Sequence, residues 1–290
     1  IVYFDFSQAS EKKRKKKTFQ MQQELAIQNI YGAKGIIIFD NKLNAWGISS
    51  GRKTMAYPVI FVHIDKPNLK PQKAKINIEN KYYPRYKSQN VVGFIKGKTQ
   101  PDTFLVFTAH YDHLGMMGNK TYFPGANDNA SGTATVIDLA RYYSKPENQP
   151  YYSIAFMLFT GEEAGLLGSE YYTSNPLFPL KKIKFVFNLD MVGAGENGIT
   201  AVNGTANEKE FSILDSLNTK NAYFPKFVKR GEAANSDHYY FHKKGIPALF
   251  FYTMGNTGPY HHPEDISSNL SLSKYPKLFD FITKFVEIYR

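Results

Sequence analysis

Cysteine is absent from the chain of 290 residues, which excludes disulfide bonds and thiolate metal sites. Any metal ion must therefore be held by histidine nitrogens and carboxylate oxygens. Long apolar runs are absent as well, because no segment approaches the roughly 18 residues that a membrane helix needs. We therefore expect no stable insertion into a membrane.

An initiator methionine and a signal segment are also lacking, since the chain starts on the apolar residues Ile1-Val2-Tyr3-Phe4. We interpret this start as trimmed, which predicts that the natural N-terminus is missing. A chain without cysteine suits the cytoplasm or export without disulfides. We favour export, to the periplasm, the cell surface or the medium, over the cytoplasm.

Positive charge is abundant, with a formal net charge of +11. Much of it lies in one run at residues 12–17, and such runs can mark contacts with nucleic acid or a membrane surface. No aromatic side chains interleave with the run, as a base-stacking groove would require. We interpret it as a solvated helix start or loop tip and predict no nucleic-acid partner.

Residues 1–70 form one compositional unit. Strands are expected at residues 1–6, 35–40 and 58–64, and a helix at 19–30. Residues 31–39 and 57–62 resemble a protease-associated domain, in which one strand follows Gly-Ala-Lys-Gly and a later strand begins at a proline. The resemblance implies a partial, smaller α/β domain of this type at residues 1–70, whose front precedes Ile1.

The second predicted domain covers residues 71–290 and begins with a polar connector. Strands are expected at residues 90–95, 103–109, 153–160, 184–189 and 248–252. Helices are expected at 131–143, 163–172, 208–217, 237–243 and 272–289. This alternation predicts an α/β domain with a largely parallel central sheet.

Histidine or carboxylate residues follow several of these predicted strands, at the edge where open α/β sheets build their sites. His110 and Asp112 follow the strand at 103–109, two positions apart, so an extended backbone puts them on one face. A carboxylate there can take the second ring N–H of the histidine and make the other nitrogen a better ligand. Taken alone, a loop histidine beside an acid is an equally good interpretation.

Asp128 lies in the small-residue segment Gly-Ala-Asn-Asp-Asn-Ala-Ser-Gly, just before a predicted helix. Small residues allow close backbone approach, and Ser131 or Asn129 could cap that helix. In isolation we interpret Asp128 itself as a helix cap.

Glu162 and Glu163 follow the strand at 153–160, and Asp190 closes the strand at 184–189. Two adjacent carboxylates at the end of a buried strand are costly unless positive charge lies nearby, although acids also suit a helix start. His261 lies in the Gly/Pro-rich loop Tyr-His-His-Pro-Glu-Asp.

Together these segments supply two imidazoles and three carboxylates without sulfur, a ligand set that suits Zn²⁺, Mn²⁺ or Co²⁺. Two ions need a bridging carboxylate, two terminal carboxylates and two imidazoles, which leaves Glu162 over. A spare acid is what hydrolysis needs as a general base.

These segments, in order from Ser88 to the C-terminus, resemble the two-zinc aminopeptidases of secreted bacterial and yeast vacuolar origin. The resemblance implies a three-layer αβα zinc-exopeptidase domain with a mainly parallel mixed sheet, two Zn²⁺ per chain and peptide substrates. It makes Glu162 the general base and Asp112 the residue that orients His110. The metal ligands that it implies are His110, Asp128, Glu163, Asp190 and His261.

Within the resemblance, Asp128 bridges, His110 and Asp190 hold one zinc, and Glu163 and His261 hold the other. The family often has a tyrosine before Ser-Asp-His for the oxyanion; residues 232–235 contain none, which leaves Tyr240 and Tyr252 as candidate substitutes. The residue preference and the oligomeric state stay open.

Other activities fit parts of the pattern. A glutaminyl cyclase uses one zinc on the same scaffold and keeps a similar His, Glu and Asp set. A carboxypeptidase or dipeptidase would differ in its tolerance of blocked N-termini. A binding protein that has lost catalysis usually lacks a ligand or the base, and here none is missing.

Overall fold

The structure is a computed structural model that describes residues 2–5, 28–29, 32–40, 57–63, 73–79 and 81–290. The chain divides into two compact units, Ile1–Ala45 with Gly51–Tyr86 and Trp46–Ser50 with Lys87–Arg290. The basic run and nearly all of the helix predicted at residues 19–30 lie outside the described residues. The domain boundary near residue 70 stays a prediction.

The first unit contains a parallel sheet in the order β1 (Val2–Asp5), β2 (Ile36–Asp40), β3 (Val59–His63). The strands lie within the ranges predicted at residues 1–6, 35–40 and 58–64. Ile36 and Ile38 of the central strand form a small buried core. The front of the strand is close-packed, because a Cβ on Gly35 would lie 3.3 Å from Pro58 Cγ.

The second unit is built on a seven-stranded sheet in the order β11-β10-β12-β9-β5-β8-β4. The pairs β9–β5, β5–β8, β12–β9 and β10–β11 are parallel, whereas β10–β12 and β4–β8 are antiparallel. The predicted mainly parallel mixed sheet is therefore confirmed. Its strands are β4 (Val91–Ile95), β5 (Gln100–His110), β8 (Tyr152–Phe159), β9 (Ile183–Leu189), β10 (Gly198–Val202), β11 (Phe227–Lys229) and β12 (Ala248–Met254).

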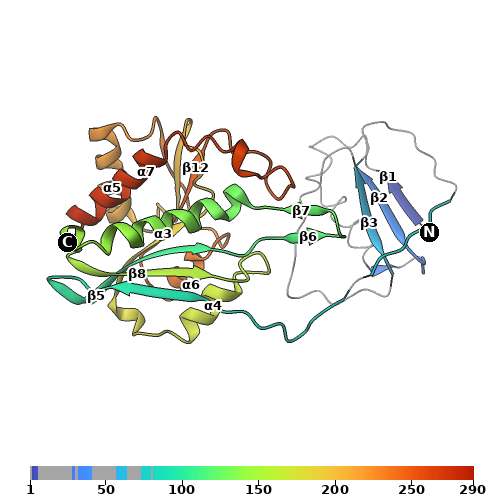
Figure 1. The fold of residues 1–290 in the computed structure, drawn as a ribbon, viewed down its shortest axis with the longest axis horizontal. Coiled ribbons are helices and arrows are strands. Elements are labelled where there is room, and N and C mark those ends of the chain that lie inside the picture. The colour runs from blue at the N-terminus through green and yellow to red at the C-terminus, as the bar shows by residue number, and fades with distance from the viewer. Residues whose placement is uncertain (1, 6–27, 30–31, 41–56, 64–72, 80) are drawn as a thin grey trace. The chain divides into compact units, whose positions relative to one another are not determined.

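Helices cover both faces of this sheet and give the three layers expected (Figure 1). Strand β9 shows why: Phe185 and Phe187 pack into the core with α3, α5 and α7, whereas Val186 packs on the other face with α4 and α6. The α-helices are α3 (Gly132–Tyr143), α4 (Leu167–Ser174), α5 (Glu208–Asn221), α6 (His238–Lys243) and α7 (Tyr275–Ile288). Shorter elements are η1 (Ala126–Ser131), η2 (Pro146–Asn148), η3 (Leu180–Lys182), η4 (Ser267–Asn269) and the hairpin β6 (Gly115–Met117) with β7 (Thr121–Phe123).

Two predicted helix starts were wrong. Helix α4 begins at Leu167 rather than at residue 163, because Gly161, Gly165 and Leu166 have φ values of 70°, 113° and 59°. This left-handed backbone keeps Glu162 and Glu163 in a loop. Helix α7 begins at Tyr275 rather than at residue 272, because Leu272 also has a positive φ of 49°.

Strands β10 and β11 were not predicted at all. Strand β11 has only three residues and leaves little sequence pattern, whereas β10 contains the β-branched residues Ile199, Thr200 and Val202 and was overlooked. No helix among the described residues is long and apolar enough to cross a membrane.

Candidate metal centre

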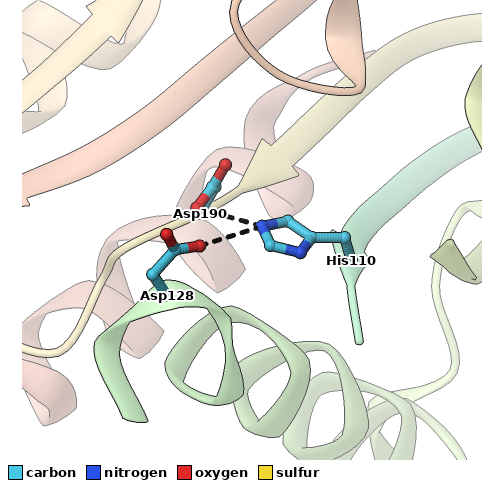
Figure 2. Close-up of side chains that lie close together, drawn as sticks. All are labelled: His110, Asp128 and Asp190. Atoms are coloured by element: carbon cyan, nitrogen blue, oxygen red, sulfur yellow. Dashed lines mark ion pairs between the residues drawn. The ribbon is translucent and has the colours of Figure 1, made fainter. Parts of the chain in front are cut away.

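His110 and Asp190 stand at the ends of neighbouring parallel strands. His110 is the last residue of β5 and Asp190 directly follows β9, so the two strands deliver both side chains to the same edge of the sheet. The Nε2 atom of His110 lies 3.5 Å from Asp190 Oδ1 and 3.2 Å from Asp128 Oδ1. Figure 2 shows the imidazole pointing at both carboxylates.

Asp128 reaches this edge from η1, in front of α3. The next residue, Asn129, supplies the cap of α3, because its Oδ1 accepts a hydrogen bond from the backbone N–H of Gly132 at 2.9 Å. Its Nδ2 donates to the carbonyl of Leu189 at 3.0 Å and so joins η1 to the end of β9. The Asp128 carboxylate faces imidazoles instead, which overturns its interpretation as a helix cap.

His261 and Glu163 meet Asp128 from the other side. The Nε2 atom of His261 lies 3.2 Å from Asp128 Oδ2 and 3.0 Å from Glu163 Oε2. The two oxygens of Asp128 thus face one histidine each. The structure therefore brings together all the side chains that the sequence proposes as ligands: His110, Asp128, Glu163, Asp190 and His261.

The donor atoms of this cluster suit a cation. His110 Nε2, His261 Nε2 and Asp190 Oδ1 are buried and have no hydrogen-bond partner among the described residues. Buried polar atoms without partners are costly, so the chemistry of this group fits the binding of a cation. Two ligands at about 2.0–2.1 Å from a tetrahedral zinc lie about 3.3 Å apart, close to the N–O spacings found here.

The charges within the cluster are coupled. Burial lowers the pKa of His110, but the Asp190 charge and the Asp112 and Asp128 carboxylates outweigh burial and raise it well above its usual value. Burial likewise opposes the rise at His261, where Asp128 and Glu163 bring the pKa to about 10. Burial raises the pKa of Asp128, but His110 and His261 lower it by a larger amount. The net result is a pKa below the usual value for an aspartate. Without metal, protons on the imidazoles offset the carboxylate charge.

Asp112 contacts both His110 and the Glu162–Glu163 loop. Its carboxylate oxygens accept the backbone N–H groups of Glu162 at 3.2 Å and Glu163 at 3.3 Å. The Nδ1 atom of His110 lies 3.1 Å from the backbone oxygen of Asp112 and 3.7 Å from its carboxylate Oδ1. The carbonyl therefore makes the closer contact with the ring, and the orienting role of the carboxylate stays a prediction.

Glu162 is placed beside the cluster without joining it. Burial raises the pKa of its carboxyl to about 9, and the charges of Asp190, Asp237 and Glu163 add to the rise while His110 opposes it. Asp237 is fully buried, which raises its pKa to about 7. A general base must be ionised, and cations bound beside Glu162 would lower this pKa because they favour the charged carboxylate.

Ser236 belongs to the Ser-Asp-His segment, which the family resemblance assigns to the pocket wall or to the residues behind the ligands, and it contacts a ligand directly. Its hydroxyl donates to Asp190 Oδ2 at 2.7 Å and accepts from Asn188 Nδ2 at 2.7 Å. Asn188 Oδ1 in turn accepts from the Thr108 hydroxyl at 2.7 Å. The chain of hydrogen bonds holds one oxygen of Asp190 and leaves the other free for His110.

Asp265 is a second supporting residue, and its role was not predicted from the sequence. Its carboxylate accepts the backbone N–H groups of Asn127 at 2.8 Å and Asp128 at 3.1 Å, and so ties the His261 loop to η1. The Tyr-His-x-Pro-x-Asp pattern contains this residue, but the pattern does not show what the acid binds. His113, a second imidazole three positions after His110, was also left without a role.

The tyrosine nearest the ligands is not one of those expected. The Tyr252 hydroxyl accepts a hydrogen bond from Arg230 at 3.1 Å, and Tyr240 lies beside Glu170. Tyr260 stacks on His261 with ring centroids 3.7 Å apart. Burial raises its pKa, and the charges of the ligand carboxylates Asp128, Glu163 and Asp190 raise it further.

Solved structures place this fold in a class. The chain superposes on BSAP, a zinc aminopeptidase from Bacillus subtilis, with a TM-score of 0.64 and 26% identity over 88% of this chain and 63% of that chain. An Acidobacteriales bacterium glutaminyl cyclase gives a TM-score of 0.57 and 23% identity over 69% of this chain and 74% of that one, a likeness of fold alone. The class is therefore that of the zinc-exopeptidase α/β fold.

Sequence comparison narrows the class to a family. The profile of peptidase family M28 matches residues 90–286, and the chain belongs to that family. Aminopeptidase YwaD of Bacillus subtilis is 31% identical over 272 residues, which are 87% of this chain and 56% of YwaD. The chain thus spans less than two thirds of YwaD and of BSAP.

Proposed function

We propose that the chain is a zinc-dependent aminopeptidase that removes N-terminal residues from peptides with two metal ions. The observation that carries the proposal is the convergence of five His, Asp and Glu side chains from five separate segments. Four of them, all but Asp128, have a buried nitrogen or oxygen without a hydrogen-bond partner among the described residues. Membership in peptidase family M28 and the likeness to BSAP support it.

The donor geometry suggests how the ions are shared. His110 and Asp190 would hold one zinc, and Glu163 and His261 the other, with Asp128 between them because each of its oxygens faces one histidine. Bound zinc supplies Lewis acidity, which polarises the scissile carbonyl and lowers the pKa of a water toward about 7.

Residues of the chain complete the reaction. The Glu162 carboxylate accepts a proton from the attacking water and later donates it to the amine leaving group. Asp112 fixes the backbone of Glu162 and Glu163 through its two amide contacts, so it sets the position of the base relative to the ligands. Tyr260, beside the ligand carboxylates, is a candidate hydrogen-bond donor to the substrate.

Two further expectations belong to this proposal. The first unit, with its parallel β1-β2-β3 sheet, would be a partial protease-associated domain that helps to select substrates. Export from the cytoplasm would bring the enzyme to its peptides.

The test is hydrolysis of a panel of aminoacyl-anilides by the full chain, with and without a chelator, alongside metal analysis. We expect turnover of substrates with a free α-amine, loss of turnover on chelation, recovery with zinc, and about two ions per chain. N-acetylated substrates serve as the matched control and should remain intact.

Other outcomes would redirect the assignment. Cleavage of blocked substrates from the C-terminus would indicate a carboxypeptidase. Cyclisation of N-terminal glutamine by a protein with one ion per chain would indicate a glutaminyl cyclase. Two bound ions without turnover of any anilide would count against the aminopeptidase.

A further inference from the structure

His113 is an imidazole that the five-ligand arrangement leaves out. It lies in the loop between β5 and β6, and its side chain is only 9% exposed. Its Nδ1 atom lies 2.7 Å from Glu163 Oε1, while His261 faces the other oxygen, Oε2, at 3.0 Å. Glu163, like Asp128, therefore presents one carboxylate oxygen to each of two histidines.

The short contact between His113 and Glu163 is an ion pair between a ring nitrogen and a carboxylate oxygen. Both ring nitrogens of His113 and the Oε1 atom of Glu163 are buried without a hydrogen-bond partner among the described residues. The same absence marks His110 Nε2 and His261 Nε2. Unpaired buried polar atoms are costly. Because His113 has such atoms, as His110 and His261 do, its chemistry fits the binding of the same cation.

The loop that carries Asp128 is shaped around the His113 ring. Gly125 has a φ of 65°, and a Cβ there would lie 2.6 Å from both Cγ and Cδ2 of His113 and 2.4 Å from the Asp128 backbone oxygen. No side chain fits in that space. The ring also meets His261 edge-on, with centroids 5.8 Å apart. The imidazole is thus held against the cluster on two sides.

Two groups of three side chains at this edge of the sheet could each hold a metal ion. The donor atoms of His110, Asp128 and Asp190 all lie within 4.8 Å of one another, and so do those of His113, Asp128 and Glu163. We propose that His113 is a sixth protein ligand, at the metal position of Asp128, Glu163 and His261. This inference rests on the proposed function, since it presumes that the centre binds metal.

The extra donor makes the two metal positions unequal. Zinc positions filled by protein donors alone are closed, whereas catalytic positions keep a place for water or substrate. The position with His113 has four protein donors, so it should retain its ion more firmly than the position of His110 and Asp190. Chelation should then remove the two ions in separate steps.

The test compares zinc binding by the full-length wild type with that of His113→Ala and His113→Asn, using competition with a chromophoric chelator. Asparagine keeps an N–H that could donate to Glu163 but lacks the imidazole nitrogen. We expect both variants to bind one of the two ions at least about 100-fold more weakly, at or beyond the range for loss of a group that only supports a ligand. Co²⁺-loaded protein should also change its visible absorption in both variants.

His242→Ala is the matched control, since His242 also lies near an acid, 3.4 Å from Glu232, but outside the cluster. It should bind zinc as the wild type does, and circular dichroism should verify that all variants fold. Recovery of binding in His113→Asn would reduce His113 to a hydrogen-bonding role and overturn the proposal. Wild-type affinity in His113→Ala would overturn it too, while leaving the proposed function intact. If the wild type bound no zinc, both the proposal for His113 and the proposed function would be refuted.

Discussion

The two sides of the candidate metal centre are built differently. The strand-end half consists of His110 and Asp190, whose side chains are 1% and 6% exposed. The loop half consists of His113, Glu163 and His261; His261 is 12% exposed and has a φ of 54°. Asp128 contacts both halves.

The difference lies in what positions each ligand. In the strand-end half, the ladder between β5 and β9 sets the backbone, and Ser236 then fixes the Asp190 rotamer. In the loop half, no ladder is available, so the Asp112 and Asp265 carboxylates hold loop amides in place. Irregular backbone can therefore carry ligands when carboxylates, rather than a neighbouring strand, bind its amide groups.

The largest expected effect concerns the base that serves both halves. Glu162→Gln should lower the turnover of aminoacyl-anilides by roughly 10²–10⁴-fold, because an amide cannot take up the proton. Zinc content should remain that of the wild type, since Glu162 is not among the proposed ligands. Retained turnover in this variant would remove Glu162 from the role of base.

The pH dependence of zinc binding tests whether the imidazoles of both halves are protonated before metal enters. The pKa of His110 is raised, and that of His261 is raised to about 10, so at neutral pH zinc must displace their protons. Apparent affinity should rise with pH, roughly tenfold per unit for each proton displaced, and level off above pH 10 for His261. Chelator competition from pH 6 to 9 measures the slope, and affinity independent of pH would refute the charge coupling.

Ser236→Ala should weaken the strand-end half selectively. The change leaves Asp190 Oδ2 and Asn188 Nδ2 without their shared hydroxyl, so we expect about 10- to 100-fold weaker binding of one ion. Ser216→Ala on α5 removes a hydroxyl that bonds only to the Ser212 carbonyl and is the control. Equal zinc affinity in both variants would show that the strand ladder alone positions Asp190.

Tyr260→Leu should produce the smallest change, in the loop half. It removes a ring that is 56% exposed and stacked on His261, and such an aromatic contact contributes about 0.5–1.5 kcal/mol. Zinc affinity should therefore fall by roughly 2- to 10-fold. Tyr260→Phe keeps the stack and should match the wild type in zinc titrations. If zinc affinity fell as much in Tyr260→Phe as in Tyr260→Leu, the hydroxyl group rather than the stacked ring would be responsible for the effect.

The sequence predicted the strand-end half better than the loop half for a physical reason. A buried parallel strand has an apolar run that marks its end, and the residue after it must reach the sheet edge, as His110 and Asp190 do. Residues 163–166 lie in a loop but were predicted as helix, since left-handed backbone at Leu166 leaves no periodic trace. Contacts across long separations, such as Asp265 with Asn127, have no local signal at all.

The order of residues along the chain has a consequence for when the centre can form. Every strand of the seven-stranded sheet has been synthesised by Met254, whereas His261 and the Asp265 tether come later. A nascent chain therefore contains the full set of strands before it can close the metal cluster. The proposed hydrolysis of peptides would begin only after His261 and Asp265 have left the ribosome.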